Sequence, residues 1–126
     1  MLLVLTVLLT AQPKEDYPAL HQRFQHGNYA EARTGYQELL RGERPAVAAF
    51  VGLAAIDRAE GEYEKSLETL GAGLKFHADD PALLAHRADL LFSLGRWDDA
   101  SRDAEAAIKK EDATFLGRWV RTRILR

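Results

Sequence analysis

The sequence contains no cysteine, one methionine and four prolines in 126 residues. The absence of cysteine excludes disulfides, thiolate metal sites and cysteine nucleophiles. The chain also has no alternating strand pattern and no low-complexity stretch. Its 47% apolar and 29% charged residues are typical of one globular domain, and the periodicity of the apolar residues indicates helices.

Motifs for catalysis and metal binding are missing as well. The chain has no Ser-His-Asp signature, no HExxH motif and no phosphate-binding loop. The four histidines, His21, His26, His77 and His86, have no metal-ligand spacing, and we expect His77 to lie in a loop of solvated charges. We therefore predict no catalytic residue, no metal, no cofactor and no small-molecule substrate, and a chain that is not an enzyme.

The charge is unevenly distributed along the chain. Residues 1–114 carry 13 basic and 19 acidic side chains, whereas the last twelve residues carry four arginines and no acid. The four arginines at the end of the chain could contact nucleic acid or anionic lipid. The net charge of −2 and the pI near 6.1 argue against nucleic acid as a partner.

Residues 1–12 form an apolar N-terminal segment that ends abruptly before Pro13. As a helix the run to Ala11 would span about 15 Å, too short to cross a membrane. It fits the apolar part of a secretory signal peptide cleaved after Ala11, although no basic residue precedes it. A misassigned start codon or an apolar strip on the first helices are the alternatives. We expect an exported or periplasmic protein, otherwise a cytoplasmic one, with no other membrane association.

A short phrase occurs three times at a spacing of 34 residues: Gly27-Asn28-Tyr29, Gly61-Glu62-Tyr63 and Gly95-Arg96-Trp97. This regular period predicts stacked supersecondary units. Each glycine suits the left-handed residue after a helix, and each aromatic is expected to pack the turn that follows. We predict helices over about 16–27, 29–40, 46–60, 63–76, 81–95 and 97–110, and a seventh over 114–126.

Within this pattern, Asp80 is expected to cap the fifth helix and Pro81 to open it. Gly71 and Gly73 lie inside the fourth helix, where glycine is unfavourable. We expect close helix–helix approach to explain both.

Antiparallel helix pairs on a 34-residue period resemble the tetratricopeptide repeat (TPR). When each shared glycine is numbered 15, the units supply many of the small and bulky residues of the family pattern: Ala32 and Tyr36 in the first unit, Phe50, Leu53, Ala54, Tyr63, Ser66, Leu70 and Gly73 in the second, and Leu84, Ala88, Leu91, Trp97, Ala100 and Ala107 in the third. The resemblance implies an all-α solenoid over 13–126, with units at about 13–46, 47–80 and 81–114 and a terminal helix at 115–126.

Several positions depart from the family pattern. Asp57 stands where a bulky residue is usual, Arg87 where leucine is usual, and Ala104 where an aromatic is usual. The terminal helix would be either a cap with a polar outer face or the start of a further unit.

The resemblance also implies where a partner binds, because TPR proteins hold partners in a concave groove formed by the first helix of each unit. At the groove positions, or beside them, this chain has Tyr17, His21, Phe24, Val51, Arg58, His86, Asp89, Phe92, Trp119 and Arg123. Aromatic residues and arginine are frequent binding hot spots. The alternative for Phe24 and Phe92 is that they only close the core.

The same resemblance excludes one subtype. Chaperone-binding TPR proteins clamp a terminal carboxylate with Lys, Asn and Arg, and the matching positions here hold Tyr17, His21, Gly52, Ala82 and His86. The expected function is therefore a protein–protein interaction module that binds a peptide or partner protein by another chemistry. The alternative is the N-terminal segment of a longer exported TPR protein whose activity lies elsewhere.

Overall fold

The computed structural model describes residues 17–43 and 45–110. The apolar segment 1–12 and the expected helix 115–126, with Trp119 and Arg123, lie outside the described residues. The described residues form six helices, and they confirm the all-α fold class: α1 (Tyr17–Gln25), α2 (Tyr29–Leu39), α3 (Val47–Ala59), α4 (Tyr63–Phe76), α5 (Pro81–Ser93) and α6 (Trp97–Lys110). Each boundary lies within two residues of the sequence expectation.

The repeated glycines end the first helix of each pair in the same way. Gly27, Gly61 and Gly95 have φ angles of 78°, 81° and 77°. At Gly27, the glycine N–H bonds to the carbonyl of Phe24 at 3.0 Å and the next N–H bonds to the carbonyl of Arg23 at 2.9 Å. The same two hydrogen bonds recur at the other two glycines, which defines a Schellman motif in every unit. The chain therefore reverses direction at each glycine.

The fifth helix begins as the sequence predicts. The Asp80 carboxylate accepts a hydrogen bond from the backbone N–H of Leu83 at 3.1 Å, and Pro81 occupies the first turn. This cap satisfies one of the backbone donors that a helix start leaves unpaired.

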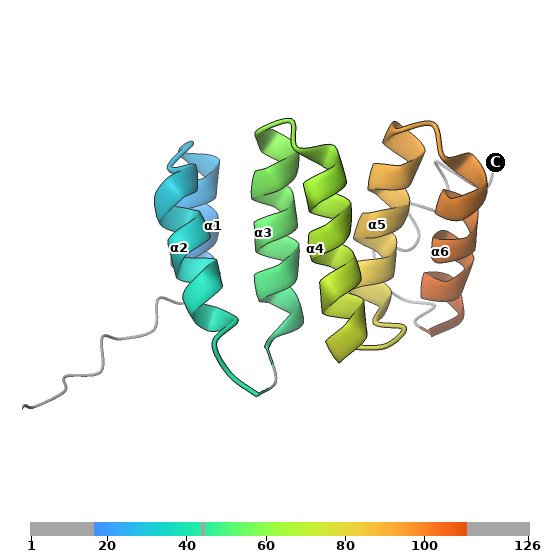
Figure 1. Cartoon of the computed structure of the whole chain (residues 1–126), viewed down its shortest axis with the longest axis horizontal. Helices are drawn as coiled ribbons and strands as arrows, with labels where there is room; N and C mark the ends of the chain where they lie inside the picture. Colours follow the sequence, from blue (N-terminus) through green and yellow to red (C-terminus); the bar gives the residue numbers. More distant parts are fainter. Residues whose placement is uncertain (1–16, 44, 111–126) are drawn as a thin grey trace, which may run out of the picture.

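The helices stack as three antiparallel pairs side by side (Figure 1). Among the described residues, α3 touches both α1 and α5, whereas α2, α4 and α6 do not touch one another. The first helices of the pairs are therefore crowded into an inner layer, and the second helices are spread over an outer layer. A row of helix pairs that is crowded on one side curves, and its inner layer becomes the concave face.

The core runs between the layers and across the unit boundaries. Leu20, Tyr36, Leu53 and Ile56 fill the first boundary, and Phe50, Leu70, Leu83 and Leu90 fill the second. Gly73 allows close packing there, because a Cβ at this position would lie 2.9 Å from Cγ of Phe50. The expectation for Gly71 is wrong, since a Cβ there would meet nothing within 4 Å.

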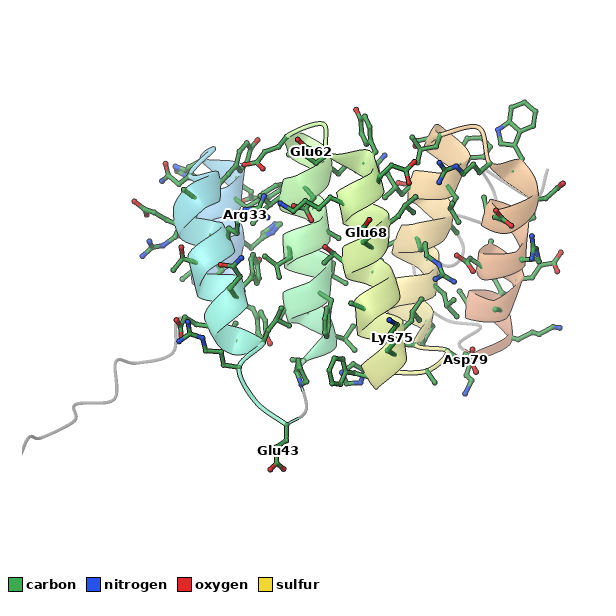
Figure 2. All side chains as sticks on the ribbon, viewed as in Figure 1. Arg33, Glu43, Glu62, Glu68, Lys75 and Asp79 are labelled. Carbon is green, nitrogen blue, oxygen red and sulfur yellow. The ribbon has the colours of Figure 1, made fainter. Side chains whose placement is uncertain are left out.

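Two departures from the repeat pattern are explained by ion pairs. The Asp57 side chain is 1% exposed, and its carboxylate accepts hydrogen bonds from Arg33 at 2.8 Å and from the Thr69 hydroxyl at 3.0 Å. Figure 2 shows Arg33 at the junction of α2 and α3. Arg87 donates two hydrogen bonds to Asp103, at 2.6 and 2.9 Å. Each charged residue replaces an apolar contact with a paired polar one.

The repeated aromatics do not all pack the turns as expected. Tyr29 is half-buried and its ring centroid lies 5.5 Å from that of Phe24, but Tyr63 is 44% exposed and Trp97 is 66% exposed. The expectation therefore holds for Tyr29 and is wrong for Tyr63 and Trp97. Tyr29 is covered because Phe24 of α1 packs on its ring.

Candidate functional site

The inner layer carries eight of the ten groove residues expected from the sequence. Tyr17, His21 and Phe24 lie on α1, Val51 and Arg58 on α3, and His86, Asp89 and Phe92 on α5, and each of them is exposed or half-buried. Trp119 and Arg123 lie outside the described part of the chain. Within each of the three helices, these residues share one side, because residues three, four or seven apart in a helix lie on the same side.

A cavity of about 550 Å³ opens where α1, α3 and α5 end at the Schellman turns. It is lined by Phe24, Ala55, Arg58, Ala59, Tyr63, Ser93 and Leu94. Phe24 and Arg58 were expected in the groove from the sequence, but Tyr63 was assigned to a turn. Its position two residues after Gly61 is the sequence feature that could have placed Tyr63 near the end of α3, and so near this cavity. The exposed ring of Tyr63 belongs to the wall of this cavity instead.

Arg58 is the polar centre of the cavity. Its Nη1 donates to the Asp89 Oδ2 at 2.6 Å, and its Nη2 donates to the Ser93 hydroxyl at 3.2 Å. The Ser93 hydroxyl in turn donates to the Asp89 carbonyl at 3.0 Å. The pair joins α3 to α5, so it links the second and third units and fixes the guanidinium in one orientation. A guanidinium held in this way loses little further freedom when it binds.

Phe24 belongs both to the core and to the cavity. It packs against the first core cluster, stacks on the His21 ring with centroids 6.2 Å apart, and also lines the cavity. The two alternatives given by the sequence are therefore not exclusive. Phe92 is half-buried on α5 but does not line this cavity.

His86 lies half-buried beside the Arg58–Asp89 pair. Burial lowers the pKa of His86 below its ordinary value of 6.5; the Asp89 charge opposes this shift and the Arg58 charge adds to it. The lowered pKa favours the neutral form of the imidazole.

Gly52 on α3 packs directly against the buried ring of Tyr36 on α2. A Cβ on Gly52 would lie 2.3 Å from Cζ of this ring, so α3 admits no side chain at that position. Tyr17 packs on the same ring with centroids 6.5 Å apart. This explains physically why a clamp residue cannot stand at position 52, since the Tyr36 ring fills that space.

The residues 17–43 and 45–110 contain no group of three or more metal-ligating side chains. His77 lies in the loop between α4 and α5 as expected, but it is half-buried rather than solvated, and its Nε2 lies 2.5 Å from the Pro45 carbonyl oxygen. It thus joins the α4–α5 loop to the α2–α3 connection. Over the same residues, no helix has the length and apolar content needed to cross a membrane.

No protein-family model matches the sequence, and a comparison with curated proteins finds no match. Among solved structures, the chain is similar to PcrH of Pseudomonas aeruginosa in complex with the chaperone binding region of PopB, with 23% identity over 86% of this chain and 87% of that chain and a TM-score of 0.69. It is similar to the type III secretion chaperone SycD of Yersinia enterocolitica in complex with a peptide of the translocator YopD, with 22% identity over 86% and 83% and a TM-score of 0.70.

A third similar structure is the first TPR of Spaghetti (RPAP3) bound to the HSP90 peptide SRMEEVD, with 14% identity over 87% of this chain and 90% of that chain and a TM-score of 0.68. At these identities the likeness establishes the fold. The chain therefore has the tetratricopeptide-repeat fold, an all-α helical repeat of stacked antiparallel pairs.

Proposed function

We propose that this chain is a protein–protein interaction module whose concave face binds a peptide segment of a partner protein. The observation that carries the proposal is the cavity at the ends of α1, α3 and α5, which combines an apolar wall with the oriented guanidinium of Arg58. Such a combination, an apolar pocket with few fixed polar groups, is typical of binding sites.

The comparisons support the same proposal. The three similar structures described above were each solved with a peptide or binding region of another protein. None of their descriptions names a small molecule, a nucleic acid or an enzymatic activity. The predicted absence of an enzymatic function stays a prediction for this chain.

A peptide-display selection tests the proposal directly. A library of random 12-residue peptides is selected against the full chain, and the affinity of enriched peptides is measured by fluorescence anisotropy. Ala55→Phe places a ring in the cavity from the middle of α3, and we expect it to abolish binding. Ala30→Phe makes the same change on an exposed position of α2 and is the matched control.

Unchanged peptide binding by Ala55→Phe would contradict the proposal. Peptides that bind wild type and Ala55→Phe with equal affinity would place the binding surface elsewhere and overturn the proposal. The triple variant Tyr17→Ala, Arg58→Ala and Asp89→Ala extends the test to other residues of the predicted groove, and we expect it to lose peptide binding.

We also propose export of the protein by residues 1–12, on the strength of the apolar run alone. The test is the intact mass of the protein recovered from cell fractions. Cleavage after Ala11 gives a product that begins at Gln12. A full-length mass in the cytoplasmic fraction alone would overturn it.

A further inference from the structure

Resting on the proposed function, we infer the chemistry of the segment that the groove binds: a carboxylate directly beside a large apolar side chain. The carboxylate pairs with Arg58, and the apolar side chain enters the cavity lined by Phe24, Ala55, Tyr63 and Leu94. Four observations lead to this assignment.

The first observation is the charge of the lining. Arg58 is the only charged residue among the described residues that line the cavity, and Ser93 and the Tyr63 hydroxyl are the only other polar side-chain groups. The remaining lining residues are apolar. An occupant with a positive charge would meet the guanidinium with no carboxylate in the cavity wall to balance it.

The second observation is the direction of the hydrogen bonds. A guanidinium has five N–H donors and no acceptor. Within the described part of the chain, Arg58 uses one donor on Asp89 and one on Ser93. The Ser93 hydroxyl has already given its hydrogen to the Asp89 carbonyl. The remaining N–H groups of Arg58 are therefore the charged donors of this cavity, and the matching group on a partner is an acceptor, of which a carboxylate is the strongest.

The third observation is the relative exposure of the two charges. The Arg58 side chain is 39% exposed, whereas that of Asp89 is 13% exposed. Asp89 is thus the more buried member of the pair, and the Arg58 guanidinium is the charge more accessible to a partner.

The fourth observation is that this chain already holds a guanidinium between two carboxylates. Arg33 donates from Nη1 to Asp57 at 2.8 Å and from Nη2 to Glu60 at 2.7 Å. A bound carboxylate on Arg58 would reproduce that arrangement, with Asp89 on one side and the partner on the other. The planar fork of arginine suits such double pairing.

The test uses the peptides selected on the full chain. We expect enriched sequences to carry Asp or Glu next to a large aliphatic or aromatic residue. Replacing that acid by its amide should weaken binding to wild type about 10- to 100-fold, the effect of one charge-assisted hydrogen-bonded pair. The amide substitution should have no effect on binding to Arg58→Met, which keeps the apolar stem and removes the charge.

Arg41→Met is the matched control, because Arg41 is exposed just after α2 and the ion pair of its side chain in the described structure is with Glu38. It should behave as wild type. Arg58→Lys keeps the positive charge but loses the planar guanidinium, and it should retain part of the preference for the acidic peptide over its amide. This second variant keeps the test valid if Arg58→Met does not fold.

The two proposals fail in different ways. Suppose that Ala55→Phe abolishes binding of the selected peptides, but that these peptides are not enriched in Asp or Glu or bind wild type equally well in their amide forms. This result overturns the inference and leaves the proposed function intact. Peptides that are all insensitive to Ala55→Phe overturn both.

Discussion

Arg33 on α2 and Asp57 on α3 form an ion pair of 2.8 Å across the boundary between the first two units. The Asp57 side chain is 1% exposed, and that of Arg33 is 20% exposed. Glu60 and Thr69 complete the hydrogen-bonding network around the pair. The pair occupies a place where the repeat pattern has a bulky apolar residue, so it determines how the first unit meets the second.

Arg33→Met should destabilise the protein strongly, because it leaves the buried Asp57 carboxylate without its main partner. Removal of one partner of a buried pair costs about 3 to 5 kcal/mol. The double variant Arg33→Met with Asp57→Leu removes both charges and should recover most of the loss. Urea unfolding of the wild type, both single variants and the double variant measures the coupling. A loss below about 0.5 kcal/mol for Arg33→Met, the size of an ordinary surface substitution, would contradict the buried pair.

The two glycines inside α4 should respond oppositely to alanine. Gly71→Ala meets nothing within 4 Å, so we expect it to stabilise the protein by about 0.5 to 1 kcal/mol through helix propensity. Gly73→Ala places a Cβ 2.9 Å from Phe50 and 3.1 Å from Leu83, and we expect it to cost about 1 to 3 kcal/mol. Thermal and urea unfolding of the two variants give the comparison, in which each serves as control for the other. Equal effects at both positions would argue against the close packing at Gly73.

Trp97 should contribute little to stability despite its size. Its side chain is 66% exposed at the start of α6, so Trp97→Ala should change the free energy of unfolding by no more than about 0.5 kcal/mol. Leu70→Ala, at a residue 1% exposed in the core, should cost about 2 to 5 kcal/mol. If Trp97→Ala lowered the free energy of unfolding as much as Leu70→Ala does, the Trp97 ring would have to be buried, which would contradict the prediction.

His86 should make stability depend on pH on the acid side of neutrality. Burial lowers its pKa in the folded chain below 6.5, so the unfolded chain binds the proton more readily. The stability that neutral His86 contributes is complete above about pH 6.5 and is lost as the pH falls through the lowered folded-state pKa. Urea midpoints between pH 7.5 and 5.5 should therefore fall less steeply for His86→Gln than for wild type.

An unchanged slope in His86→Gln would mean that the imidazole titrates as it does in the unfolded chain.

The helices and their turns could be predicted from the sequence because local chemistry specifies them. The Gly-x-aromatic phrase predicts the three Schellman turns, and Asp80-Pro81 predicts the start of α5. The 34-residue period predicts the stacking of the helix pairs. The spacing along the chain determines these features through the 3.6-residue period of the helix.

The contacts across units depend on the tertiary structure. Asp57 and Arg87 look like misfits in the sequence, but Arg33 and Asp103 become their partners only when the helices pack. Gly71 and Gly73 are two residues apart in one helix, and only the neighbouring Phe50 and Leu83 distinguish them. Tyr63 lines the cavity because the third unit brings Ser93 and Leu94 beside it. Each of these outcomes is set by side chains distant in sequence, and a local pattern contains no information about their distances.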